Sequence, residues 1–363
     1  MSDRRPERLA AAVAAIETAR IDGLLLTGLP NIRYLTGFSG SSALVFVTAR
    51  GEVLLLTDFR YDTQARAEVG DFARVSIEAQ SLWAGLWQLL PQYPHVEVAG
   101  FESAHLLHRD FQRLLEAGAR WKWRPTAELV ESLRERKDES EVEAIAEAAG
   151  VATRALERTL TQVREGMSEL QVAGVLEHAL RDEGSESFPF ETIAASGERA
   201  ALPHARASAR RISRGDFLLL DFGAQRAGYC ADVTRTVVVG KASDEQRAVY
   251  DVVRAANETA AAGVRAGMRG RDADALARSY IERHGYGEAF GHSLGHGLGL
   301  EVHEAPRLAR TAEAPLAAGA VVTIEPGIYR PGWGGVRIED DVHLSPAGPT
   351  VLTHFTRDLI EIG

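Results

Sequence analysis

The stretch FLLLDFGAQRAGYCADVTRTVVV (217–239) decides the fold of the C-terminal part of the chain. It holds one apolar run that ends in Asp221 and a second run that begins at Asp232. Apolar runs of this length, bounded by turn residues, are typical of buried strands. Gly228 lies between them and suits a turn. The stretch therefore predicts a hairpin that brings the two carboxylates together from adjacent strands.

Three further motifs place acids or a histidine among glycines and strand-forming residues. They are HSLGHGLGLEVHE (292–304), VTIEPGIY (322–329) and GGVRIEDD (334–341). With the hairpin they contribute four carboxylates and one histidine, namely Asp221, Asp232, His296, Glu325 and Glu339. Buried carboxylates that gather in one place are tolerated only when they are protonated, paired or bound to metal. Because too few Lys or Arg residues accompany these motifs, divalent cations are the expected counter-charge.

Each motif taken alone also has an ordinary explanation. Asp221 and Asp232 could flank a solvated turn, and Glu325 could simply close a strand. His292 and His296 are four residues apart, as in a helical zinc motif, but the glycines around them argue against a helix. No Glu stands directly after the first of these histidines, so they do not form the HExxH pattern of zinc metalloproteases.

The hairpin stretch supplies two motifs, LLLDFG (218–223) and CADVTRT (230–236). Taken in order with the three further motifs, these five resemble those of the pita-bread metallopeptidases, above all the Xaa-Pro dipeptidases (prolidases) and aminopeptidase P. Five ordered motifs at compatible intervals are far more specific than any one of them. The resemblance covers nearly the whole chain, because the first third is similar to the non-catalytic domain of this family. It implies an α+β protein, with an N-terminal α/β creatinase/prolidase-like domain and a C-terminal pita-bread domain in which helices cover a curved antiparallel sheet.

The length of 363 residues is sufficient for two domains. Helical and strand patterns alternate throughout the first third of the chain. Capping-box pairs then predict helix starts after Asp138, Ser168 and Ser243, each followed three residues later by Glu or Gln. We expect the N-terminal domain to span residues 1–132 and the catalytic domain to span residues 133–363.

Composition excludes several classes of protein. The chain has 41 Lys and Arg against 51 Asp and Glu, a formal charge of −10, and this balance argues against a nucleic-acid partner. No run of apolar residues is long enough to predict a membrane span. The N-terminus lacks the apolar core of a secretory signal. The single cysteine, Cys230, excludes an intramolecular disulfide and fits a reducing compartment, so we expect a cytoplasmic enzyme.

The resemblance also implies roles for individual residues. The metal ligands would be the four carboxylates and His296. His204, His292 and His303 match histidines that line the substrate site of the family. Glu325 additionally matches a glutamate that passes a proton to the leaving nitrogen, while His204 or His303 would stabilise the charge that develops on the carbonyl oxygen.

Neighbouring positions on the same strands suggest supporting residues. Arg337 lies two residues before Glu339, and Thr234 lies two residues after Asp232, so each shares a strand face with a carboxylate. Both are candidates to hold a ligand in its orientation through a hydrogen bond. Asp340 and Asp341 are expected to be solvent-facing or structural rather than ligands.

The cofactors that the resemblance implies are two divalent metal ions. An oxygen-rich ligand set favours Mn²⁺, with Co²⁺, Zn²⁺ or Fe²⁺ as alternatives. The implied substrates are short proline-containing peptides, and the implied assembly is a homodimer. An Xaa-Pro dipeptidase is favoured over an aminopeptidase P that accepts longer peptides, and a non-catalytic pita-bread binding protein is a distant alternative. A creatinase-like amidinohydrolase is disfavoured because such enzymes lack the metal ligands.

Overall fold

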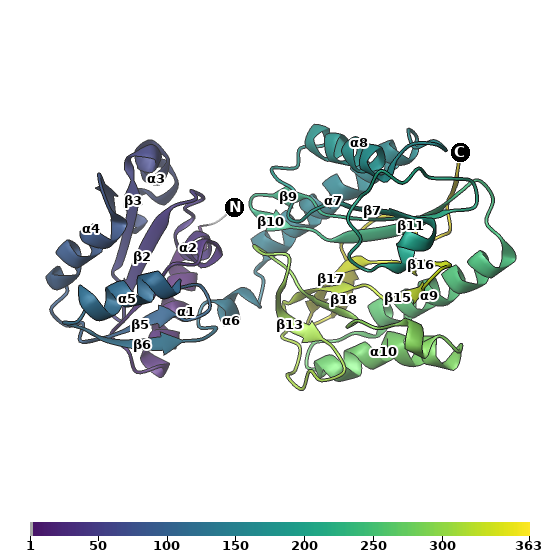
Figure 1. The fold of residues 1–363 in the computed structure, drawn as a ribbon. Helices are drawn as coiled ribbons and strands as arrows, with labels where there is room; N and C mark the ends of the chain where they lie inside the picture. The colour runs from purple at the N-terminus through teal and green to yellow at the C-terminus, as the bar shows by residue number, and fades with distance from the viewer. Residues whose placement is uncertain (1–2) are drawn as a thin grey trace. The chain divides into compact units, whose positions relative to one another are not determined.

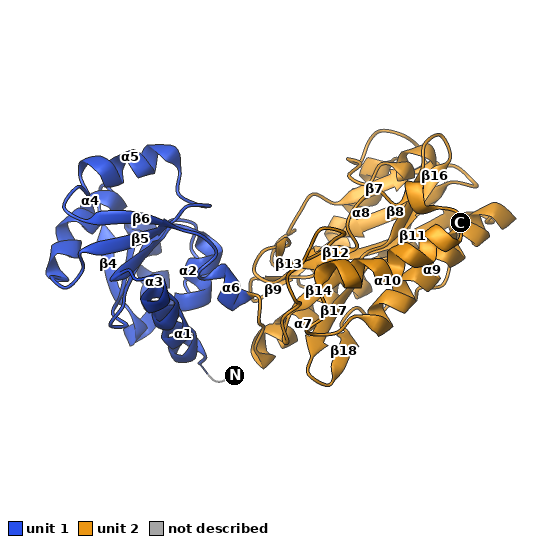
Figure 2. Cartoon of the chain, turned by 90° about the horizontal axis from the view of Figure 1, so that it is seen from below, with its two compact units in different colours: residues 1–134 blue, residues 135–363 orange. Residues whose placement is uncertain are grey.

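The computed structural model describes residues 3–363, which form two compact units (Figure 2). Unit 1 extends to Arg134, and unit 2 comprises Glu135–Gly363. No helix within residues 3–363 is both long enough and apolar enough to cross a membrane.

Unit 1 is built on a six-stranded mixed sheet with the strand order β4-β3-β2-β1-β5-β6. The central strands β1, β2 and β3 are antiparallel, whereas the outer pairs are parallel. The strands are β1 (Gly23–Leu26), β2 (Ala43–Thr48), β3 (Val53–Asp58), β4 (Arg74–Glu78), β5 (Val98–Glu102) and β6 (Lys122–Thr126). The helices are α1 (Arg5–Thr18), α2 (Leu29–Thr36), α3 (Asp62–Val69), α4 (Leu82–Leu89), α5 (His108–Glu116) and α6 (Glu131–Arg134).

Unit 2 contains four long helices and two principal sheets (Figure 1). The helices are α7 (Glu139–Leu160), α8 (Glu169–Asp182), α9 (Asp244–Gly263) and α10 (Gly270–Arg283). The first sheet, in the order β19-β11-β8-β7, is formed by β7 (Ile193–Ser196), β8 (Phe217–Phe222), β11 (Val233–Val239) and β19 (Glu361–Ile362). The second, in the order β13-β12-β14-β17-β18, is formed by β12 (Gly295–Gly297), β13 (Glu304–Leu308), β14 (Val321–Ile324), β17 (Asp340–Ser345) and β18 (Gly348–Val351).

Two short hairpins complete unit 2. They are β9 (Gln225–Arg226) with β10 (Tyr229–Cys230), and β15 (Gly327–Arg330) with β16 (Gly334–Arg337). The hairpin predicted between Asp221 and Asp232 is confirmed, because β8 and β11 pair antiparallel with Thr234 opposite Asp221.

The predicted helix starts are also confirmed. Asp138, Ser168 and Ser243 each cap a helix, and the Glu or Gln three residues later closes a full capping box in each case. Each box satisfies two backbone N–H groups that a helix start would otherwise leave unpaired.

Successive side chains of β8 point alternately into two apolar cores, one on each face of the sheet. Leu218, Leu220 and Phe222 pack under α7 and α8 in one apolar core. The intervening residues Phe217 and Leu219 point the other way, into the core that contains α9 and α10. Successive side chains of a strand point to opposite faces, so Asp221 shares the inner face with Phe217 and Leu219. The expected α+β architecture, with helices covering a predominantly antiparallel surface, is confirmed.

Candidate metal centre

The ends of four strands bring the acidic residues together. Asp221 lies near the end of β8, and Asp232 lies one residue before β11. Glu339 lies between β16 and β17, and its backbone N–H donates to the carbonyl of Thr234 at 3.1 Å. This hydrogen bond joins the start of β11 to the segment before β17, where the carboxylates of Asp232 and Glu339 meet.

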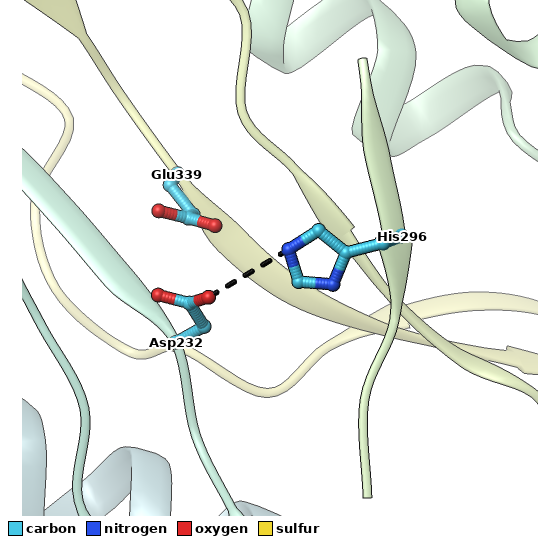
Figure 3. A group of neighbouring side chains, drawn as sticks. All are labelled: Asp232, His296 and Glu339. Carbon is cyan, nitrogen blue, oxygen red and sulfur yellow. Dashed lines mark ion pairs between the residues drawn. The ribbon is translucent and has the colours of Figure 1, made fainter. Parts of the chain in front are cut away.

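Three of the predicted ligands form a compact group. Each of Asp232, His296 and Glu339 offers one ligand atom, and these atoms lie within 4.8 Å of one another (Figure 3). Nε2 of His296 is 3.8 Å from Oδ2 of Asp232 and 3.4 Å from Oε1 of Glu325. The side chains therefore converge from β12 and from the segments flanking β11, β14 and β17.

Asp221 joins the group through Arg337. The buried guanidinium donates from Nη2 to Oδ2 of Asp221 and from Nε to the hydroxyl of Thr234 at 3.0 Å. That hydroxyl donates in turn to Oε2 of Glu339 at 2.6 Å. Arg337 and Thr234 thus orient Asp221 and Glu339, whereas the strand spacing had suggested Glu339 and Asp232 as their partners.

One arginine cannot neutralise this cluster of acids. Oδ1 of Asp221 and Oδ1 of Asp232 are buried and have no hydrogen-bond partner within residues 3–363. A buried carboxylate oxygen without a donor is costly, so such an atom indicates a missing cation or proton. Four carboxylates with one imidazole are also a donor set that suits oxygen-preferring divalent ions. The residues present therefore fit a metal centre.

Without a cation, the same environment favours protonated acids. Burial and then the charge of Glu339 raise the pKa of Asp232 well above its usual value. Burial and then the charge of Glu325 do the same to the pKa of Glu339. The pKa of Glu325 rises to about 8, mainly through burial, although the charge of Arg337 opposes the rise.

His296 has the protonation state and the tautomer that a nitrogen ligand requires. Burial lowers its pKa to about 4, so the imidazole is neutral at physiological pH. Nδ1 lies 3.1 Å from the carbonyl oxygen of Gly297, and this contact favours the tautomer with the proton on Nδ1. The lone pair of Nε2 then faces Asp232 and Glu325.

Three more histidines surround the acids. Nε2 of His292 is 2.9 Å from the hydroxyl of Tyr329, which also accepts a hydrogen bond from Arg337 at 2.7 Å. The ring centroids of His303 and His296 are 4.2 Å apart. Burial and then the charge of His204 lower the pKa of His303. His204 follows Pro203, whose carbonyl oxygen accepts a hydrogen bond from Nη1 of Arg337 at 3.2 Å.

Tyr329 belongs to this site but was not identified from the sequence. It lies in the VTIEPGIY motif, four residues after Glu325, and nothing in its spacing distinguishes it from a core aromatic. Burial raises the pKa of its hydroxyl to about 12, so this group remains a hydrogen-bond donor at neutral pH.

Asp340 and Asp341 are fully buried, so the solvent-facing alternative for them is wrong. Asp340 accepts hydrogen bonds from Arg235 and Arg357, both at 2.7 Å. Asp341 accepts a hydrogen bond from the backbone N–H of Asp232 at 3.2 Å. Both carboxylates therefore support the segments that carry the candidate ligands.

Gly295 allows β12 to lie unusually close to β14. A Cβ atom on Gly295 would lie 2.0 Å from the carbonyl oxygen of Thr323. We expect Gly295→Ala to lower the free energy of unfolding by about 1–3 kcal/mol, the usual cost of overpacking. It should also weaken metal binding, because the N–H of His296 donates to the hydroxyl of Thr323.

Urea unfolding and metal titration of the Gly295→Ala variant measure both effects. Gly291→Ala is the matched control, since a Cβ there meets no atom within 4 Å. Equal stability of the two variants would contradict this account of the close strand contact.

Comparison with known proteins places this geometry in a family. Residues 143–346 match the sequence profile of Metallopeptidase family M24, and residues 8–136 match the Creatinase/Prolidase N-terminal domain. An Xaa-Pro dipeptidase from Pyrococcus horikoshii is 34% identical over 355 residues, which are 98% of this chain and 99% of that protein.

Two solved structures are similar over almost their whole length. An Xaa-Pro dipeptidase from Bacillus anthracis has a TM-score of 0.95 at 41% identity, covering 99% of this chain and 100% of that one. An X-Pro aminopeptidase from Thermotoga maritima has a TM-score of 0.89 at 36% identity, covering 98% of this chain and 99% of that one. The protein is an enzyme of metallopeptidase family M24, with a creatinase/prolidase N-terminal domain ahead of its pita-bread catalytic domain.

Proposed function

We propose that this metallopeptidase cleaves the Xaa-Pro bond of dipeptides, using two divalent ions held by Asp221, Asp232, His296, Glu325 and Glu339. The observation that supports the metal site is the convergence of three buried carboxylates and the half-buried Glu325 on a neutral imidazole. Two of the carboxylate oxygens have no donor among the residues that the structure describes. The similarity to Xaa-Pro dipeptidases over nearly the entire chain supports the substrate class. Mn²⁺ is the favoured ion, because the donor set is rich in oxygen.

The bound ions would supply a water nucleophile at neutral pH and polarise the scissile carbonyl. The chain supplies the remaining functions. Glu325, held beside the imidazole of His296 at 3.4 Å, accepts the proton of the attacking water and passes it to the leaving proline nitrogen. His204 and His303 donate hydrogen bonds to the carbonyl oxygen as negative charge develops on it.

Arg337 and Tyr329 set the geometry of this machinery. Arg337 contacts Asp221, Thr234 and Tyr329, so its position decides how Asp221 is presented. Tyr329 connects the same guanidinium to His292 at the substrate side. A rigid network of this kind holds ligands ready before the substrate arrives, which lowers the cost of reaching the transition state.

The distinction between dipeptidase and aminopeptidase is tested with two substrates. Protein stripped of metal and reloaded with Mn²⁺ is expected to hydrolyse Ala-Pro and to leave Ala-Pro-Ala largely intact. Preferential cleavage of Ala-Pro-Ala would instead favour an aminopeptidase, which the similarity to the Thermotoga maritima enzyme keeps as the second candidate. Cleavage of neither peptide by metal-loaded protein would contradict the proposed substrate class.

A further inference from the structure

Glu169, in the first turn of α8, receives an unusual number of hydrogen bonds for a buried carboxylate. Its side chain is fully buried, yet five donors point at its two oxygens. Oε1 accepts from the backbone N–H and the hydroxyl of Ser196, both at 2.8 Å. Oε2 accepts from Nε of Arg199 at 3.0 Å and from the N–H and hydroxyl of Ser208 at 3.0 and 2.6 Å.

These donors come from the two ends of one loop. Ser196 is the last residue of β7, and Ser208 lies twelve positions further along, so residues 197–207 project between them. The backbone of α8 reinforces the second end, because Leu170 N–H donates to the carbonyl of Ser208 at 3.0 Å. A single carboxylate therefore closes the base of the loop.

The loop carries His204, and its tip is attached to the metal centre. Nη1 of Arg337 donates to the carbonyl oxygen of Pro203 at 3.2 Å, directly before His204. Within the loop, Nη2 of Arg199 donates to the carbonyl of Arg206 at 2.6 Å. His204 itself is exposed, so backbone attachments rather than packing of its side chain must hold it in place.

We propose that Glu169 is a positioning residue, which fixes the loop of residues 197–207 so that His204 faces the metal centre. All five hydrogen bonds to the carboxylate come from Ser196, Arg199 and Ser208, none of which is a candidate metal ligand or His204, so it acts on His204 through the loop. A buried carboxylate is stable only when its hydrogen-bonding capacity is used, and here the two ends of the loop use it. The role given to His204 rests on the proposed function. The attachment of the loop to Glu169 does not depend on it.

The test is Glu169→Gln, which keeps the shape of the side chain. Whichever way the new amide is oriented, its NH₂ group must face donors from one end of the loop, which opens that end. We expect kcat for Ala-Pro to fall by about 10- to 100-fold with little change in KM, because displacement of about an ångström costs that much. The metal content should remain that of the unchanged enzyme.

A double-mutant comparison separates positioning from general destabilisation. In a His204→Ala background, Glu169→Gln should change kcat by less than about twofold, because the group that it positions is gone. Gln171→Ala is the matched control, since it removes a capping contact of the same helix without touching the loop. An equal loss of kcat with and without His204 would overturn the proposal.

Hydrogen exchange provides a readout that does not depend on activity. Amides of residues 197–207 should exchange faster in Glu169→Gln than in the unchanged protein, and unchanged exchange would also overturn the proposal. If Glu169→Gln does not fold, Ser208→Ala removes only the hydroxyl donor at one end of the loop and should give a smaller change in the same direction. If the wild-type enzyme cleaves no Xaa-Pro peptide, the proposed function fails. The hydrogen-exchange result would still decide whether Glu169 holds the loop in place.

Discussion

Asp232→Asn is expected to reduce kcat/KM for Ala-Pro by about a thousandfold or more, the scale of transition-state stabilisation that a catalytic metal supplies. The asparagine has nearly the same volume, but it cannot offer two anionic oxygens to the ions. Asp232 lies within the compact ligand group with His296 and Glu339, so its charge is central to the site. Metal analysis of the purified variant should give less than the full complement of the unchanged enzyme.

The same substitution is expected to stabilise the metal-free protein. Burial and then the charges of Glu339, Asp221 and Glu325 raise the pKa of Asp232, so the metal-free fold carries the free-energy cost of keeping this acid protonated, which asparagine does not. The metal-free variant should therefore unfold at a higher temperature than the metal-free parent, although it is far less active. Asp272→Asn, at an exposed position on α10, is the control and should change neither property. Full activity in the Asp232→Asn variant would contradict a ligand role.

Removal of metal is expected to make stability fall as the pH rises. The folded-state pKa of Glu325 is raised from 4.5 to about 8, so the folded protein retains a proton that the unfolded chain releases. The stabilising contribution of that proton is complete below the unfolded pKa and is lost as the pH rises through the folded pKa. Between these limits the free energy of unfolding should fall by about 1.4 kcal/mol per pH unit for each retained proton.

Urea unfolding at a series of pH values, with and without Mn²⁺, measures this dependence. In the metal-loaded protein the bound cations already balance the ionised carboxylates, so its stability should not decline as the pH rises. Metal binding should also raise the free energy of unfolding at every pH. Asp232 and Glu339 shift in the same direction as Glu325 and should steepen the decline. A metal-free protein that is equally stable across this range would show that the acids do not form a repelling cluster.

The sequence predicts much of the architecture, because the relevant signals are local. A capping box depends on residues three positions apart, so Asp138, Ser168 and Ser243 could be identified without knowledge of the rest of the fold. The hairpin that carries Asp221 and Asp232 likewise depends on two apolar runs and one turn. The grouping of the five candidate ligands followed from resemblance, since their spacing alone leaves ordinary explanations open.

The contacts that hold the site together could not be predicted in the same way. Thr234 was paired with Asp232 by position along one strand, but its hydroxyl donates to Glu339, which lies 105 positions further along the chain. Tyr329 contributes through its contact with Arg337, but in the sequence it looks like an ordinary core aromatic. Glu169 contributes through Ser208, which is 39 positions away, but in the sequence it looks like an ordinary acid in the first turn of a helix. Burial of Asp340 likewise depends on Arg235 and Arg357. The expected homodimer and cytoplasmic location stay predictions.

The spread of the candidate ligands along the chain has a consequence for biosynthesis. The first, Asp221, and the last, Glu339, are separated by about half of unit 2, and Arg337 must also be in place before Asp221 is held. Contacts between such distant positions form late in folding, because the chain must close a long loop before they are made. A nascent chain still lacking its C-terminal strands would thus expose the early acids without the means to retain an ion. Acquisition of metal should therefore coincide with completion of the chain, and cofactor content can report how much of a preparation has matured.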